Sequence, residues 1–206
     1  MLIFEDQFFN ENIKNIAGCD EAGRGPLCGP VVASAVILPA DFKNELINDS
    51  KKLTSKERDK LFDVIKKNAL AIGIGIVSPK EIDEINIYAA SKKAMLLALK
   101  EINIPIDMIL TDYMPLKFNN IEAISLVKGD AKARCIAAAS IIAKVTRDRL
   151  MDEYSKKYPE YHFDKHKGYP TKEHLEILKK FGIIKGFYRE SYKPVQEILY
   201  PPITLF

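Results

Sequence analysis

Short apolar runs recur along the chain, and each is bounded by Gly, Pro, Asp or Asn. They occupy residues 16–19, 31–38, 69–77, 108–111 and 121–127. Runs of this length with such boundaries predict β-strands. Short links join some of them and helical patterns separate the others. We therefore expect one sheet with both antiparallel and parallel neighbours.

Helical periodicity fills the intervals between these runs. Thr54 or Ser55 is a suitable N-cap for a helix that turns Leu61 and Ile65 inward and its lysines outward. A second helical stretch covers residues 78–102 and starts at Ser78-Pro79, with Glu81 following. Strands that alternate with helices in this way indicate a mixed α/β fold.

The later part of the chain is mainly helical. A long helix is expected over residues 131–158, with small side chains at 137–140 that let a helix approach a sheet closely. Proline and glycine then interrupt the pattern, and Thr171 caps a further helix that ends near Phe181. The expected organisation is a single unit over 1–206, with a core over about 16–158, a helical extension over about 159–195 and a tail over 196–206.

Length and composition exclude several classes of protein. The 206 residues are 47% hydrophobic and 29% charged, which is ordinary for one globular domain and excludes disorder, collagen and coiled coil. The apolar runs are shorter than the roughly 18 residues that a membrane span needs. Glu5 and Asp6 interrupt the apolar start, unlike a signal peptide. Three cysteines without metal-ligand spacing indicate reduced thiols and a cytoplasmic protein.

The net charge of +3 is unevenly distributed. Residues 128–193 carry 16 of the 31 Lys and Arg but only 9 of the 28 Asp and Glu, which leaves 15 against 19 elsewhere. All three histidines also lie in this basic segment. Such a segment favours a polyanionic partner, most often nucleic acid, although lysine-rich helix faces also serve solubility.

Acidic residues follow several of the predicted strands. Asp20 and Glu21 end the first run, Asp112 ends the run at 108–111, and Asp130 follows the run at 121–127 by two residues. In α/β sheets, ligands bind outside the carboxyl ends of the strands. If these strands are neighbours, the four carboxylates converge and repel one another unless divalent cations lie among them.

Oxygen ligands of this kind select Mg²⁺ or Mn²⁺, and two such ions about 4 Å apart suit the attack of water on a phosphodiester. Each acid also has a simpler interpretation. Asp130 suits a helix N-cap, Asp112 suits a turn, and the pair Asp20-Glu21 suits an exposed turn.

A glycine-rich segment, Gly23-Arg24-Gly25, comes directly after the first acidic pair. Glycines let backbone amides approach a ligand closely, and Arg24 adds a cation beside the acids. A phosphodiester held over metal ions requires such an arrangement, although a plain hairpin loop would also use these glycines.

Together these motifs resemble a known family. The ordered set is GCDEAGRGP at 18–26, DSKKL at 49–53, EIDEINI at 81–87, KGD at 128–130, AAASIIAKVTRD at 137–148 and HKGYPT at 166–171. This set resembles the bacterial type 2 ribonucleases H (ribonuclease HII) over nearly the whole chain. The resemblance implies a ribonuclease H-like fold, a five-stranded mixed sheet flanked by helices, with a helical C-terminal extension.

The resemblance also implies a function. It implies an endonuclease that hydrolyses the RNA strand of RNA–DNA hybrids and cuts 5′ to ribonucleotides embedded in duplex DNA, leaving 5′-phosphate and 3′-hydroxyl ends. By position, the metal-binding acids are Asp20, Glu21, Asp112 and Asp130, with two Mg²⁺ or Mn²⁺ ions in the active complex. The loop that recognises the ribose 2′-OH is Gly23, Arg24 and Gly25.

Further substrate contacts are implied at other positions. Tyr169 matches the tyrosine that reads the RNA–DNA junction. Lys51 and Lys52 suit phosphate contacts, although solvated loop lysines remain an alternative. His166 suits a surface or phosphate-contacting histidine better than a catalytic one. After Asp112 the family commonly has a Gly-Asn-like turn, where this chain has Tyr113-Met114.

Two other classes of function stay open at this point. One is a different carboxylate–metal phosphotransferase, such as a transposase or junction resolvase, against which the Gly-Arg-Gly loop argues. The other is a non-catalytic hybrid-binding protein, against which the four acids argue. The tail also ends in Leu205-Phe206 behind prolines, which resembles peptides that bind the sliding clamp; packing of this pair on the enzyme's own surface is the alternative.

Overall fold

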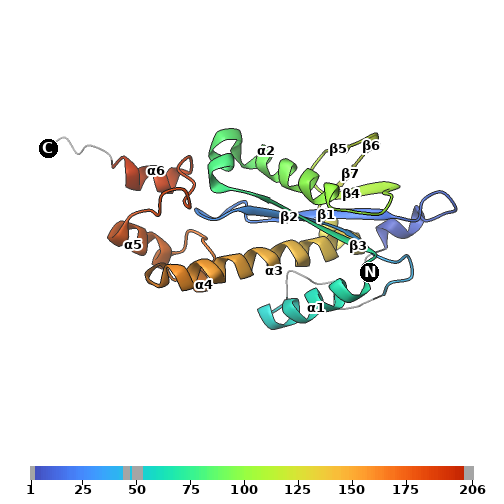
Figure 1. Cartoon of the computed structure of the whole chain (residues 1–206), viewed down its shortest axis with the longest axis horizontal. Coiled ribbons are helices and arrows are strands. Elements are labelled where there is room, and N and C mark those ends of the chain that lie inside the picture. The colour runs from blue at the N-terminus through green and yellow to red at the C-terminus, as the bar shows by residue number, and fades with distance from the viewer. Residues whose placement is uncertain (1–2, 44–46, 48–52, 202–206) are drawn as a thin grey trace.

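A five-stranded mixed sheet forms the centre of the computed structural model, which describes residues 3–43, 47 and 53–201 (Figure 1). Its order is β3-β2-β1-β4-β7. The strands are β1 (Ile16–Ala22), β2 (Val31–Ile37), β3 (Ala71–Val77), β4 (Met108–Asp112) and β7 (Ile124–Leu126). Pairs β1–β2 and β2–β3 are antiparallel, whereas β1–β4 and β4–β7 are parallel. The expected mixed sheet is confirmed.

Helices cover both faces of the sheet. In Figure 1, α2 (Pro79–Lys100) lies on one face and α3 (Arg134–Lys157) on the other, with α1 (Ser55–Asn68) outside α3. Glycines on the strands make this close packing possible. A Cβ on Gly75 would lie 2.0 Å from the carbonyl oxygen of Ala94 on α2, and one on Gly18 would lie 2.2 Å from the carbonyl carbon of Cys135 on α3. The helix axes therefore sit closer to the sheet than any larger residue allows.

The helices begin where the capping residues predict. The side chain of Thr54 accepts a hydrogen bond from the backbone N–H of Glu57, and that of Ser78 accepts one from Glu81. The carboxylate of each glutamate in turn accepts the backbone N–H of its cap residue. Such reciprocal bonds satisfy backbone groups that the first turn leaves without partners. The stretch expected over 78–102 forms α2 with a local break at Asn86, where φ is 65°.

Two expected elements differ from those observed. The run at 121–127 is not one strand, because β6 (Ile121–Glu122) pairs with β5 (Lys117–Phe118) in a separate hairpin and only β7 joins the main sheet. The long helix begins at Arg134 rather than 131, because residues Gly129–Ala131 form the 3₁₀-helix η3.

The start of α3 is held by a distant residue. Its N-cap position is Ala133, which has no side-chain oxygen to cap the helix. Instead, the carboxylate of Glu5, in the 3₁₀-helix η1 (Phe4–Gln7), accepts a hydrogen bond of 3.1 Å from the backbone N–H of Cys135. A residue 130 positions earlier in the chain thus replaces the local cap.

The C-terminal elements gather at one end of the molecule (Figure 1). They are η4 (Pro159–Tyr161), α4 (Phe163–His166), α5 (Lys172–Phe181) and α6 (Lys193–Leu199). The predicted cap is confirmed, since the hydroxyl of Thr171 accepts a hydrogen bond from the N–H of His174. An apolar cluster joins these elements to the core through Leu27 and Met151.

Near the C-terminus, α6 continues to Leu199, so the helical part extends beyond the expected boundary at 195. Leu205 and Phe206, which carry the clamp-binding prediction, lie outside the described residues. Across residues 3–43, 47 and 53–201, no helix has both the length and the apolar character to cross a membrane.

Candidate active site

Two aspartates lie side by side at the ends of the central parallel strands. In the register of β1 and β4, Cys19 lies opposite Thr111, and the next residues are Asp20 and Asp112. Side chains alternate along a strand, so Asp20 shares the α3 face with Gly18. Asp20 is 7% exposed. The expected meeting of these two carboxylates at one edge of the sheet is therefore observed.

Burial and repulsion dominate the electrostatics of this edge. The pKa of Asp20 is well above its ordinary value because of burial first, and then because of the charges of Glu21 and Asp112. Hydrogen bonds from Ser140 and from the Glu21 N–H at 2.7 Å act in the opposite direction. Burial also raises the pKa of Glu21. The guanidinium of Arg24, whose Nη1 lies 3.3 Å from Oε1 of Glu21, acts in the opposite direction. The site concentrates carboxylates that a cation would stabilise.

Asp130 reaches the same region from η3. Its side chain is buried, and the N–H of the preceding Gly129 donates a 2.8 Å hydrogen bond to Oδ1 of Asp112. This bond ties the loop of Asp130 to the end of β4. The simpler interpretation of Asp130 as the cap of the long helix is wrong, because α3 starts at Arg134 with Ala133 at its N-cap position.

The acids suit a divalent cation by their chemistry. Oε2 of Glu21 is buried and has no hydrogen-bond partner among the described atoms, which leaves one carboxylate oxygen available for a ligand. In the part of the chain that the structure describes, however, no three Asp, Glu, His or Cys side chains converge closely enough to enclose a metal ion as they stand. Carboxylate oxygens are donors of the kind that hard divalent cations prefer.

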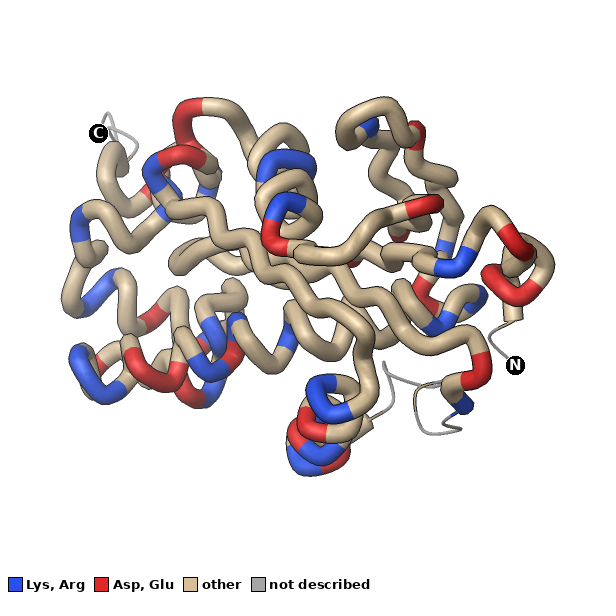
Figure 2. Tube along the Cα trace, turned by 45° about the vertical axis from the view of Figure 1, so that its right-hand side comes forward, with Lys and Arg blue, Asp and Glu red and all other residues tan. Residues whose placement is uncertain are grey.

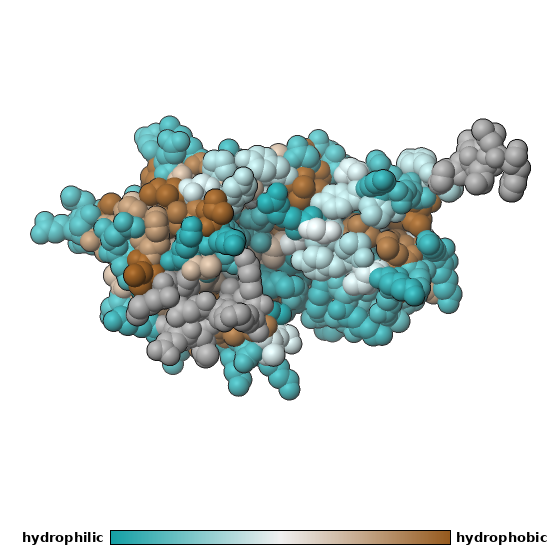
Figure 3. Space-filling model, turned by 180° about the vertical axis from the view of Figure 1, so that it is seen from behind, coloured by the Kyte–Doolittle hydropathy of each residue, from teal (hydrophilic) through white to brown (hydrophobic). Residues whose placement is uncertain are grey.

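A cleft of about 420 Å³ opens beside these acids. Seen from behind, the molecule is hollowed between its two ends, and hydrophilic residues form most of the wall (Figure 3). The lining residues are Glu21, Ala22, Gly23, Arg24, Gly25, Arg58, Ser140, Ile141, Lys144 and Tyr169. A Cβ on Gly25 would lie 3.6 Å from the Tyr169 ring, so the ring lies directly beside this glycine in the wall of the cleft.

Comparison with known proteins identifies the family. The family model described as ribonuclease HII matches residues 17–195. The chain belongs to the ribonuclease HII family. Ribonuclease HII of Acetivibrio thermocellus is 58% identical over 183 residues, which cover 89% of this chain and 72% of the relative. Ribonuclease HII of Listeria innocua is 55% identical over 194 residues, which cover 94% of this chain and 74% of the relative.

Solved structures agree with this assignment. Ribonuclease H2 from Pyrococcus horikoshii OT3 superposes with a TM-score of 0.77 at 30% identity and covers 89% of this chain and 96% of its own. Ribonuclease HII from Archaeoglobus fulgidus, solved in a complex with PCNA, has a TM-score of 0.68 at 25% identity and covers 85% and 92%. The ribonuclease H-like fold expected from the motifs is confirmed.

One departure from the ribonuclease HII pattern has a structural explanation. Tyr113 follows Asp112 at the position where the motif commonly has glycine, and its φ is 54°. Glycine adopts this left-handed conformation at little cost, whereas a tyrosine is strained there. The backbone of the turn is held by a 2.9 Å hydrogen bond from the Tyr113 N–H to the carbonyl of Leu126.

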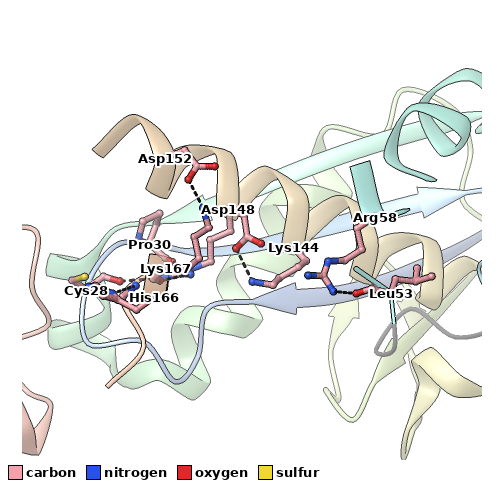
Figure 4. A network of polar contacts seen from close by, with 11 residues as sticks. Cys28, Pro30, Leu53, Arg58, Lys144, Asp148, Asp152, His166 and Lys167 are labelled. Carbon is pink, nitrogen blue, oxygen red and sulfur yellow. Dashed lines mark hydrogen bonds and ion pairs between the residues drawn. The ribbon is translucent and has the colours of Figure 1, made fainter. Parts of the chain in front are cut away.

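The cleft contains three polar side chains that sequence reasoning did not assign to the site. Arg58 comes from α1, and Ser140 and Lys144 come from α3. Figure 4 shows Arg58 beside Leu53, whose carbonyl it bonds at 2.8 Å, and Lys144 beside Asp148 at 2.6 Å. Ser140 and Lys144 are one helical turn apart and therefore lie on the same side of α3. Their spacing indicates that both line the cleft once it is known which side of α3 faces the cleft.

Two stacked histidines hold the backbone around Tyr169. The rings of His166 and His174 lie 4.0 Å apart. Nδ1 of His166 accepts the Gly168 N–H, so its Nε2 carries the proton and donates to the carbonyl of Tyr161. His166 is 6% exposed. The expectation of a surface or phosphate-contacting histidine is therefore wrong, because this ring is buried and bonded at both nitrogens.

His174 completes this arrangement. Its Nδ1–H donates to the carbonyl of Tyr169 at 2.9 Å, and its Nε2 accepts from the hydroxyl of Tyr188 at 2.7 Å. Burial, and then the charge that His166 would carry, lowers the pKa of His174 from 6.5 to about 4. Both rings are therefore neutral at pH 7.

The basic segment is less uniform in space than in sequence. Figure 2 shows Lys and Arg interspersed with Asp and Glu along the chain. Several of its lysines pair with carboxylates, for example Lys167 with Asp152 and Lys165 with Glu173. Lys51 and Lys52, expected to contact phosphates, lie outside the described residues.

The histidine pair predicts a specific pH dependence. Between pH 4 and 6.5 the folded state binds fewer protons than the unfolded state, so acidification destabilises the protein. We expect this ring to remove about 2 kcal/mol of the free energy of unfolding between pH 7 and pH 5. Urea unfolding in EDTA at both pH values should show a smaller loss for His174→Phe than for the wild type. Equal losses in the two proteins would contradict this role, since the acids titrate in both.

Proposed function

We propose that this cleft is the catalytic site of an endoribonuclease, with residues 1–206 acting as one unit. It hydrolyses the RNA strand of RNA–DNA hybrids and cuts 5′ to ribonucleotides embedded in duplex DNA. The observation that carries this proposal is the position of Asp20 and Asp112 at adjacent strand ends, beside the Gly23–Gly25 loop. Membership of the ribonuclease HII family over residues 17–195 supports it.

Four acids of the site would hold the metal ions: Asp20, Glu21, Asp112 and Asp130. We propose Mg²⁺ or Mn²⁺, with two ions in the active complex. The raised pKa values of Asp20 and Glu21 support this assignment, because a cation relieves the repulsion that raises them. When bound, such ions polarise the scissile phosphate and lower the pKa of water, and the chain needs no nucleophilic side chain of its own.

The remaining residues bind and orient the substrate. The backbone at Gly23, Arg24 and Gly25 recognises the ribose 2′-OH, since glycines let the main chain approach it closely. Tyr169 lies beside this loop in the cleft and stacks on the sugar or base at the RNA–DNA junction. For the contacts with phosphates we propose Lys51 and Lys52. Arg58 and Lys144, which line the cleft, are proposed for the same role.

The rival functions are distinguished by one assay. Duplex DNA with a single ribonucleotide is cut only by the proposed enzyme, and only with Mg²⁺ or Mn²⁺ present. A transposase or resolvase would not depend on the 2′-OH, and a non-catalytic hybrid-binding protein would bind without cutting.

Replacing Asp20 by Asn tests the metal site. We expect cleavage to fall by a hundredfold or more, because lost metal stabilisation is worth several kcal/mol and about 1.4 kcal/mol is tenfold in rate. In EDTA the variant should unfold at the same or a higher temperature, since a buried, repelled carboxylate is removed. The rise in melting temperature on adding Mn²⁺ should be lost. Asp63→Asn, on the exposed face of α1, is the control, and wild-type turnover by Asp20→Asn would refute the assignment.

Replacing Tyr169 by Ala tests the reading of the junction. Cleavage at one embedded ribonucleotide should fall more than cleavage within a long hybrid, because only the first substrate has a junction at every productive site. Tyr169→Phe keeps the ring and should retain most of the selectivity. Single-turnover rates on both substrates provide the measurement, and equal losses for Tyr169→Ala would remove the junction role.

We also propose that the tail beyond residue 201 binds a sliding clamp. The support is the Leu205-Phe206 pair behind prolines and the Archaeoglobus fulgidus relative solved with PCNA. Two adjacent apolar anchors on an extended tail can fill a hydrophobic pocket. Deleting residues 203–206 should abolish clamp binding without changing the melting temperature or the activity. A lower melting temperature with unchanged clamp binding would instead show that the tail packs on the enzyme.

A further inference from the structure

The loop at residues 23–30 is held by a buried guanidinium from the C-terminal segment. Nη2 of Arg189 donates to the carbonyls of Gly23 and Gly29 at 2.6 and 2.9 Å. Nη1 donates to the carbonyl of Arg24 at 3.0 Å, and Nε donates to that of Gly29 at 3.1 Å. One side chain, 160 to 166 positions away in sequence, thus binds three carbonyls of this loop.

A second guanidinium continues the same arrangement. Arg147, on α3, donates to three backbone carbonyls. Its Nε bonds that of Pro30 at 3.0 Å, its Nη2 that of Cys28 at 3.1 Å and its Nη1 that of Lys167 at 3.0 Å. Figure 4 shows Cys28, Pro30 and Lys167 gathered beside this part of α3. The two arginines therefore hold five carbonyls at the two ends of the loop, and Arg147 links the loop to the segment that carries Tyr169.

Both charges are buried at a cost. Arg147 and Arg189 are 0% exposed, and neither takes part in an ion pair within 4 Å among the described residues. Burial, followed by the charge of Arg189, lowers the pKa of Arg147 to about 10, and burial lowers that of Arg189. Both stay protonated at neutral pH. Two like charges in the interior are stabilised here by hydrogen bonds to backbone carbonyls and, for Arg189, also to the hydroxyl of Tyr192, which ties them to one loop conformation.

The position of Arg189 is itself secured from two sides. The hydroxyl of Tyr192 donates to the carbonyl of Arg24 at 2.7 Å and accepts from Arg189 at 3.0 Å. The carboxylate of Asp83 on α2 accepts the backbone N–H groups of Glu190 and Ser191, both at 2.9 Å. The C-terminal segment is thereby attached to the core, and Arg189 projects from it into the loop.

The peptide geometry shows what these bonds accomplish. In a trans peptide the C=O and the following N–H point in opposite directions. The carbonyls of Gly23 and Arg24 point at Arg189, so the N–H groups of Arg24 and Gly25 point away from it. Arg24 and Gly25 also line the cleft, beside Tyr169. Arg189 thus determines which way two amide donors of the Gly-Arg-Gly loop are turned.

We propose that Arg189 is a positioning residue that determines selectivity for the ribose 2′-OH by orienting the amides of Arg24 and Gly25. This role rests on the proposed function of the loop, and it adds a determinant from outside the loop and outside the cleft. Arg147 holds the neighbouring carbonyls, so that the loop and Tyr169 keep a constant separation.

The test compares Arg189→Lys with the wild type on two duplexes. One contains a single ribonucleotide and the other a 2′-fluoro nucleotide at the same position, whose fluorine accepts hydrogen bonds poorly. Lysine keeps the charge, but its single ammonium nitrogen cannot reproduce the five hydrogen bonds that the planar guanidinium makes from three nitrogens. We expect the ratio of kcat/KM values, ribonucleotide over 2′-fluoro, to fall about tenfold, the effect of one lost hydrogen bond.

Arg134→Lys is the matched control. Arg134 is also a buried arginine, but it lies at the start of α3 and pairs with Glu5 and Asp6, away from the loop at residues 23–30. The substitution should lower the melting temperature and leave the ratio unchanged. Tyr192→Phe removes one bond to the Arg24 carbonyl and should lower the ratio by a smaller factor; it decides the matter if Arg189→Lys does not fold. An unchanged ratio in whichever of these two variants folds, with activity merely reduced, would overturn the proposal. A wild type without preference for the ribonucleotide would instead overturn the proposed function.

Discussion

The repulsion between carboxylates at the carboxyl ends of the inner strands β1 and β4 is the constraint on which the rest of the structure depends. Asp20 and Asp112 are adjacent because β1 and β4 run parallel in one register, and Glu21 follows Asp20 directly. Their negative charges are poorly solvated, which raises the pKa of Asp20 and of Glu21. A fold that concentrates charge in this way is stable only if other parts of the structure hold the strands together.

Close packing of helices on the sheet supplies that support. Gly18 and Gly75 leave room for α3 and α2 to pack directly against the strands. Glu5 caps α3 from the N-terminal segment, and α3 in turn places Ser140 beside Asp20. The stability gained by apolar burial thus offsets the electrostatic cost at one edge of the sheet.

Positive charge is arranged around the acids in two layers with different tasks. Arg24, Arg58 and Lys144 line the cleft, where an anionic substrate would meet them. Arg147 and Arg189 lie deeper and bind only backbone carbonyls and one hydroxyl, so they shape the loop rather than touch the cleft. The neutral His166–His174 pair performs a similar task for the segment of Tyr169. The C-terminal extension therefore contributes to the site chiefly by holding its loops.

The sequence by itself determined the mixed sheet, the caps at Thr54, Ser78 and Thr171, the family, and the acids at the strand ends. These features depend on local patterns, because periodicity and capping involve residues only a few positions apart. The tertiary structure alone decided the division of residues 121–127 between two sheets, the cap from Glu5, and the burial of His166. It alone also joined Arg189 to Gly23 across 166 positions. The physical reason is that hydrophobic periodicity shows which side of an element is buried, whereas the partners of a buried polar group depend on which distant segments the fold brings together.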